Sequence, residues 1–162
     1  WIFVSGLALD PGAARDAASG TRGAVVSLGL PAVGTAGIRT SHLTAQAAHA
    51  LGRLPGAGPV VSYADDGALA LAVQSPELAR LFVSREIGPL LGTGPLLDEL
   101  RETLRTLIDR GGSLVRTADA LYVHRNTIAY RLKRLEELLG RDPLSRPMET
   151  QLALRLAAHL AG

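Results

Sequence analysis

The sequence has no cysteine, one methionine and one lysine, and aromatic residues make up only 4% of it. The absence of cysteine excludes disulfide frameworks, thiolate zinc sites and cysteine nucleophiles. Long apolar segments are also lacking. The apolar run at the start, Trp1 to Leu9, is too short to cross a bilayer, and it has neither the basic flank nor the cleavage site of a signal peptide. We therefore expect a cytoplasmic protein without a membrane segment.

The overall composition indicates a globular chain whose charge is unevenly distributed along the sequence. Its 162 residues are 47% hydrophobic, which suits one or two compact domains. The net charge is only +2, but residues 1–95 are balanced, so the surplus lies in the C-terminal part. Arginine accounts for nearly all basic residues, and we attribute this bias to a GC-rich genome. The chain opens abruptly on an apolar run at Trp1, which predicts the C-terminal part of a longer protein.

Residues 112–140 have the pattern of a helix-turn-helix. The second helix is predicted to begin near His124 and to end at Gly140, where glycine can adopt the left-handed conformation that closes a helix. This helix has an apolar stripe of Ile128, Leu132, Leu135 and Leu139, opposite a polar face of Asn126, Tyr130, Lys133 and Glu137. From residue 110 to residue 134 there are six basic residues and one acidic residue, a charge that suits a polyanion. On periodicity and charge alone, an ordinary helical core with solvated arginines is as plausible as a DNA-binding surface.

The run from Ala120 to Leu132, ALYVHRNTIAYRL, closely resembles the C-terminal helix-turn-helix of the PucR family of bacterial transcriptional regulators, which includes the sugar-diacid regulators. The shared core, L-x-V-H-R-N-T-[IVL]-x-Y-R-L, is long and specific. One departure is Ala129, where the family often carries a basic residue, and this substitution bears on sequence preference.

The flanking segments follow the family's order of parts. A helix is expected over residues 96–110, with an apolar face of Leu97, Leu100, Leu104, Leu107 and Ile108. A Gly111-Gly112-Ser113 break follows, in which Ser113 can cap the next helix. After a proline-punctuated loop, residues 148–160 are predicted to return to helix, and they contain the family's L-A-L-R-L pattern. Met148, Leu152, Leu156 and Leu160 lie in helical register there. Together with Ala153, Leu154 and Ala157 they form a wide apolar band, which is either a dimerisation surface or is buried against the helix over residues 96–110.

The resemblance implies a recognition helix that enters the major groove with its N-terminal residues nearest the base edges. We expect base contacts from Asn126, Ala129, Tyr130 and Lys133, and phosphate contacts from Arg125, Thr127 and Arg134. His124 either caps the helix or donates to a phosphate, and Ser113 completes the set of candidate DNA-binding residues. Arg131 lies beside the apolar stripe, so its stem is expected to be packed.

Residues 1–92 are predicted to form an α/β module. Strands are expected over 1–9, 23–30 and 60–63, helices over 11–19, 40–54 and 77–91, and residues 67–74 fit either state. This half is similar to the degenerate GGDEF-like domain that precedes the helix-turn-helix in PucR-type regulators. The similarity lies in the order of strand, glycine-rich turn, helix containing Ser41, strand and Asp65-Asp66-Gly67. The Gly-Gly-Asp/Glu-Glu-Phe motif of an active cyclase is absent, and two adjacent carboxylates do not by themselves form a metal clamp.

The sequence thus predicts an α/β GGDEF-like module over 1–92, for regulation or dimerisation, and an all-α helix-turn-helix domain over 95–162. The boundary is placed in the flexible segment from Gly92 to Pro95. We expect a transcriptional regulator that binds double-stranded DNA sequence-specifically as a homodimer, with a small-molecule effector acting through an upstream region. No metal site, cofactor or enzyme activity is predicted, because His42 and His49 lack a third ligand and no serine lies in a G-x-S-x-G context.

Two alternatives remain open at this point. The same helices could form a catalytically inert domain that binds another protein, or the chain could be an enzyme descended from nucleotide cyclases. A steep salt dependence of binding favours DNA over a protein partner, because phosphate contacts release counterions. Nucleotide turnover dependent on Mg²⁺ would support the enzyme.

Overall fold

The computed structural model describes residues 12–13, 16 and 25–160. The chain divides into two compact units, one comprising Trp1–Pro76 with Ala158–Gly162 and the other Glu77–Ala157. Each unit is described by itself below. Among the described residues, no helix is long and apolar enough to cross a membrane.

The first unit contains a small βαβ arrangement. Strands β1 (Val26–Leu28) and β2 (Val60–Ser62) pair in parallel, with Val26 opposite Val60, and helix α2 (Gly34–Gly52) connects them. Helix α3 (Tyr63–Ala72) follows directly. The core of this unit is made of small and branched apolar side chains, namely Ala48, Leu51, Val61, Leu69, Ala70 and Val73. Helix α2 approaches the sheet closely at Gly52, where a Cβ would lie 2.7 Å from Cγ1 of Val25.

The predicted α/β GGDEF-like module is not supported by this unit. The strand expected over 1–9 lies outside the described residues, as does most of the helix expected over 11–19. The strand expected over 23–30 is reduced to Val26–Leu28, and the one over 60–63 is confirmed as Val60–Ser62. Residues 67–74, which fitted either state, are mostly helical, since α3 extends to Ala72. In the part of this unit that the structure describes, the strands therefore form one two-stranded sheet and no larger one.

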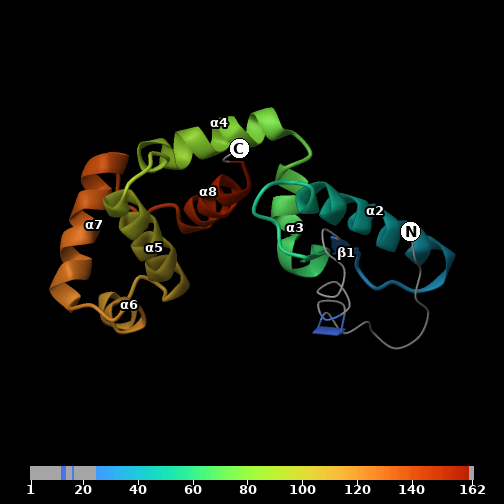
Figure 1. Ribbon diagram of the computed structural model, residues 1–162, viewed down its shortest axis with the longest axis horizontal. Coiled ribbons are helices and arrows are strands. Elements are labelled where there is room, and N and C mark those ends of the chain that lie inside the picture. Colours follow the sequence, from blue (N-terminus) through green and yellow to red (C-terminus); the bar gives the residue numbers. More distant parts are fainter. Residues whose placement is uncertain (1–11, 14–15, 17–24, 161–162) are drawn as a thin grey trace. The chain divides into compact units, whose positions relative to one another are not determined.

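The second unit is entirely helical in its described elements. Helix α4 (Pro76–Ile87) leads into the short 3-10 helix η1 (Gly88–Leu90), and α5 (Pro95–Asp109), α6 (Leu114–Leu121), α7 (Arg125–Leu139) and α8 (Pro147–Leu160) follow. Helices α5, α6 and α7 contact one another in all three pairs, and Figure 1 shows them side by side. Their shared core consists of fully buried side chains, which include Leu100, Leu104, Leu107, Ile128 and Leu135.

The predicted helices of this unit are confirmed, and α8 buries part of its apolar band. In α8, Met148 is 82% exposed and Leu152 is half-buried. The residues that α8 buries are Thr150, Ala153, Leu154 and Leu156. Of the apolar band predicted on this helix, Leu156 is buried, Leu152 and Leu160 are half-buried and only Met148 is exposed. The helix is apolar on several sides, so periodicity alone could not select the side that faces its neighbours.

The chain passes from the first compact unit to the second between residues 76 and 77. The domain boundary at Gly92 to Pro95 stays a prediction. Helix α4 groups with the C-terminal helices, and its Glu86 forms ion pairs with Arg141 and Arg146. Arg101 of α5 also ties the intervening segment to the helices, since its guanidinium donates to the backbone oxygens of Leu90 and Gly92. Glycines at 92 and 94 thus mark a turn inside the second unit.

Candidate nucleic-acid interface

The first helix of the helix-turn-helix begins at a side-chain cap. Ser113 is the N-cap of α6, and its Oγ accepts a hydrogen bond from the backbone N–H of Arg116 at 3.4 Å. The hydroxyl of the buried Thr117 donates to the carbonyl oxygen of Ser113 at 2.8 Å, which fixes the same turn. Gly111 precedes this cap with a φ of 64° and closes α5. The predicted capping role of Ser113 is confirmed, and its side chain is engaged with the helix.

The turn between the two helices is closed by Tyr122 in the left-handed conformation, with φ 55° and ψ 39°. The backbone N–H of Val123 donates to the carbonyl of Ala118 at 3.0 Å, the bond that typically closes a helix with such a residue. The side chain of Tyr122 is 96% exposed. The turn therefore places an aromatic ring in solvent directly before the second helix.

The second helix, α7, also begins at a side-chain cap. His124 is its N-cap, and the His124 Nδ1 atom accepts from the backbone N–H of Asn126 at 3.2 Å. His124 was predicted either to cap the helix or to donate to a phosphate, and in the structure it caps the helix. The helix ends at Gly140 with a φ of 65°, where the sequence places its end.

The two faces of α7 differ as predicted. Ile128 and Leu135 are completely buried, while Leu132 and Leu139 are half-buried. The opposite face presents polar and basic side chains to solvent, and Tyr130 on it is 68% exposed. Of the candidate DNA-binding residues on this helix, Thr127 is half-buried and the others are exposed: Arg125, Asn126, Ala129, Tyr130, Lys133 and Arg134. These residues occupy one accessible surface at and after the N-terminus of α7.

Not every basic residue near this surface is available to a ligand. Arg131 is only 14% exposed, and it forms an ion pair with Glu99 of α5 at 2.5 Å. Its Nη1 atom also donates to the hydroxyl of the buried Thr103. Arg134 pairs with Glu137 one turn along α7 at 2.9 Å, with both side chains about half-exposed. The other two basic residues of α7, Arg125 and Lys133, do not take part in these ion pairs.

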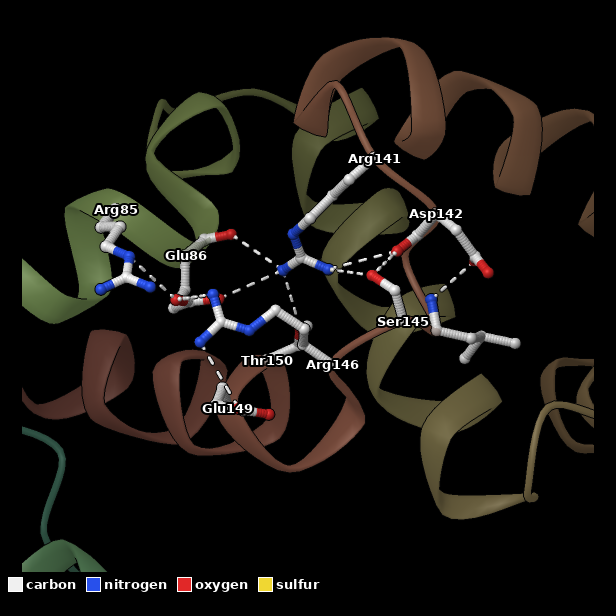
Figure 2. Close-up of polar contacts among 9 residues, drawn as sticks. Arg85, Glu86, Arg141, Asp142, Ser145, Arg146, Glu149 and Thr150 are labelled. Carbon is white, nitrogen blue, oxygen red and sulfur yellow. Dashed lines mark hydrogen bonds and ion pairs between the residues drawn. The ribbon is translucent and has the colours of Figure 1, made fainter.

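A buried carboxylate connects the end of α7 with α4 and α8. Glu86 is 2% exposed, and Figure 2 shows it among three arginines, Arg85, Arg141 and Arg146. The Arg146 Nη1 atom lies 2.8 Å from Glu86 Oε1, and the Arg141 Nη2 atom lies 3.4 Å from Glu86 Oε2. Arg141 directly follows Gly140, and its Nη2 also donates to Thr150 Oγ1 at 2.9 Å. Glu86 thus anchors the segment in which the second helix of the motif ends.

Two residues near this surface were missed by reasoning from the sequence. Tyr122 occupies a turn position that the sequence pattern leaves unspecified, and nothing local indicates that a non-glycine residue adopts the left-handed conformation there. Glu86 lies in a helix of ordinary amphipathic pattern, where an acidic residue is usually solvated. Two of its three arginine partners, Arg141 and Arg146, are 55 and 60 residues away in sequence, so no spacing rule could find them.

The candidate carboxylates and histidines of the first unit lie on helices α3 and α2. Asp65 and Asp66 lie in the first turn of α3, and Asp66 marks a kink with φ −117° and ψ 15°. His42 and His49 both belong to α2. Across the described part of the chain, no three His, Cys, Asp or Glu side chains gather in a way that could hold a metal ion.

Comparison with known proteins assigns the helix-turn-helix segment. Residues 100–160 match the family model of the PucR C-terminal helix-turn-helix domain. The transcriptional activator PmfR of Paenarthrobacter nicotinovorans is 39% identical over 74 residues, which cover 46% of this chain and 16% of that protein. The purine catabolism regulatory protein of Bacillus subtilis is 46% identical over 61 residues, covering 38% of this chain and 11% of that protein. An uncharacterized protein of Thermomonospora curvata is 37% identical over 95 residues, covering 59% of this chain and 49% of that protein. The matched segment spans less than half the length of each relative.

Proposed function

We propose that this chain, whose residues 100–160 form a PucR-type C-terminal helix-turn-helix domain, is the DNA-binding part of a transcriptional regulator. The observation that carries the proposal is the N-terminal half of α7, the second helix of the motif. One face of this half-helix carries the buried Ile128, and the other face exposes Asn126, Tyr130 and Lys133. The names of two relatives, a transcriptional activator and a purine catabolism regulatory protein, support the same function.

In the proposed complex, α7 lies in the major groove of double-stranded DNA with its N-terminus nearest the base edges. Asn126 can form a bidentate contact with adenine, and Ala129 can contact only the methyl group of thymine. Tyr130 and Lys133 complete the base-facing set. Arg125, Thr127 and Arg134 flank the groove, where the phosphates run.

The structure refines the electrostatics of this proposal. Because Arg131 is held by Glu99 and Thr103, it contributes packing within the domain more than contact with DNA. Arg134 can reach a phosphate only by leaving or sharing its pair with Glu137. We therefore assign the largest share of phosphate contact on α7 to Arg125, while Lys133 adds unpaired positive charge on the base-facing side.

The finer parts of the function are proposals of the same kind. A single helix-turn-helix contacts too few base pairs to select one site in a genome, so we propose that the regulator acts as a homodimer with two recognition helices about 34 Å apart. A small-molecule effector would regulate its binding to DNA. The protein would have no enzymatic activity of its own, and its place of action would be the cytoplasm.

Selection from a random duplex library, followed by fluorescence anisotropy on the selected duplex, tests the proposed function. We expect Asn126→Ala and Lys133→Ala each to weaken binding by about 1 to 3 kcal/mol at physiological salt, because each removes a contact in the groove. Only Lys133→Ala should also reduce the slope of log K against log salt, by about one, since lysine releases a counterion. Arg80→Ala is the matched control, because Arg80 is an exposed cation on α4 outside residues 100–160.

Unchanged affinity in both variants would show that α7 does not read the DNA. Binding that is weakly dependent on salt would favour the alternative of a protein-interaction domain, because a protein interface lacks the counterion release of phosphate contacts.

A further inference from the structure

We propose that the hydroxyl group of Tyr122 donates a hydrogen bond to a DNA phosphate beside the recognition helix. The inference rests on the proposed DNA-binding function and adds a contact residue outside the set predicted from the sequence. Three independent observations support it: the backbone conformation of Tyr122, the exposure of its side chain, and its place in the motif.

The backbone of Tyr122 is strained for its residue type. Among the described residues, it is the one non-glycine residue with a positive φ, and every other position with a positive φ is a glycine. The comparison within the domain is direct, because Gly111 closes α5 and Gly140 closes α7 in the same conformation. A residue with a Cβ is disfavoured in the left-handed region, and such strain in a native structure points to a functional role. Glycine would close α6 with less strain.

The side chain of Tyr122 offers no compensating packing. It is 96% exposed, more than any other aromatic residue of the described chain. A buried aromatic ring would stabilise the fold through its contacts, but this ring has almost none to lose. Neither the backbone conformation nor the packing of Tyr122 therefore stabilises the fold. We infer that its side chain contacts a binding partner.

The position of Tyr122 identifies the partner. It lies in the turn two residues before His124, the N-cap of α7, and the exposed Arg125 and Asn126 follow. In helix-turn-helix complexes the first helix crosses the phosphate backbone while the recognition helix occupies the major groove, and Tyr122 is the residue at which that first helix, α6, ends. A phenol hydroxyl is an uncharged donor, and tyrosine is among the side chains that contact phosphate oxygens. The geometry of the turn thus fits a neutral phosphate contact that positions the helix without reading sequence.

The test compares Tyr122→Gly and Tyr122→Phe with the wild type, using the full chain and a fluorescein-labelled mixed-sequence duplex of roughly 30 base pairs. Tyr122→Gly is expected to raise the melting temperature by about 2 °C, since it relieves the left-handed strain. The same variant should bind the duplex roughly tenfold more weakly. Tyr122→Phe keeps the ring and the strain, so it should melt like the wild type but bind nearly as weakly as Tyr122→Gly.

Because tyrosine is uncharged, both variants should keep the salt slope of the wild type, and the loss should be equal on the mixed duplex and on a selected one. Leu78→Ala serves as the control, because it truncates a side chain that is 66% exposed on α4. Wild-type affinity in Tyr122→Phe would overturn the hydroxyl contact, and wild-type affinity in Tyr122→Gly would overturn any contact of this residue with DNA. A lower melting temperature in Tyr122→Gly would assign the residue to packing instead. Failure of the wild type to bind either duplex would refute the proposed function itself, which is a separate result.

Discussion

Arg131 of α7 donates a hydrogen bond to the hydroxyl of Thr103, a completely buried residue of α5, with the Arg131 Nη1 and Thr103 Oγ1 atoms 3.1 Å apart. The same guanidinium pairs with Glu99. Two basic residues that lie close together in sequence, Arg131 and Lys133, therefore have different roles, because the first faces the neighbouring helix and the second faces solvent.

Substitution of these two residues should separate stability from DNA binding. We expect Arg131→Ala to lower the free energy of unfolding by about 1 to 2 kcal/mol, because it leaves the buried Thr103 hydroxyl without this donor and removes a packed stem. Lys133→Ala should change stability by less than about 0.5 kcal/mol, as an exposed substitution does, and should weaken DNA binding only. Urea titrations of the full chain measure both effects. Equal unfolding midpoints for the two variants would refute the structural role of Arg131.

Loss of the buried carboxylate of Glu86 should loosen the end of the recognition helix. Glu86→Gln removes the charge that Arg141 and Arg146 face. We expect the free energy of unfolding to fall by about 2 to 3 kcal/mol. This loss is at or below the low end of the range for breaking a buried ion pair, because both arginines are partly exposed and can turn to solvent. Glu102→Gln, at an exposed position of α5, is the matched control. Unfolding midpoints that agree for the two variants would contradict this anchoring role.

The capping role of His124 can be separated from a phosphate contact by two substitutions. His124→Ala removes the Nδ1 acceptor of the Asn126 N–H and should cost about 1 kcal/mol of unfolding free energy. His124→Asn should retain most of the stability, since asparagine is a favoured N-cap. If His124→Asn also retains wild-type affinity in the anisotropy assay, the cap accounts for the residue. A stable but weakly binding His124→Asn variant would instead assign it a phosphate contact.

Glu149 provides a prediction about pH. A hydrogen bond from its own backbone N–H, with a smaller contribution from Arg146, holds the pKa of the Glu149 carboxyl below 4.5. A carboxyl with a lowered folded pKa stabilises the fold above its unfolded pKa, and this contribution is lost as the pH falls through the folded pKa. In an NMR titration we expect a Glu149 midpoint below 4.5, raised by Arg146→Gln but still under the ordinary value. A midpoint that does not move in Arg146→Gln would exclude the contribution of that arginine.

The proposed homodimer can be tested by light scattering on the full chain with and without DNA. The closing helix was one candidate surface, but Ala153, Leu154 and Leu156 are buried within the chain, which leaves a smaller apolar surface on α8 than its sequence suggests. We expect a dimer on DNA that carries two half-sites about one helical turn apart. A monomer at tens of micromolar that binds a single half-site with no preference for repeats would contradict a dimer formed by this chain.

Local features of the sequence determined most of the helix-turn-helix. Ser113, His124 and Gly140 specify where α6 begins and where α7 begins and ends, because caps depend on residues within one or two turns. The spacing of Ile128 and Leu135 likewise specified the buried face of α7. The pattern around them also indicated the resemblance to the PucR C-terminal helix-turn-helix and, with it, the proposed function.

Tertiary structure alone decided how these parts are used. Arg131 looks like one more basic residue until α5 supplies Thr103 and Glu99, and Glu86 looks solvated until two distant arginines meet it. The buried face of α8 and the helical state of residues 67–72 were likewise chosen by neighbouring elements, because short or broadly apolar segments have no single preferred state on their own. A sequence therefore fixes interactions that close within a few residues, while contacts between distant residues depend on how the helices assemble.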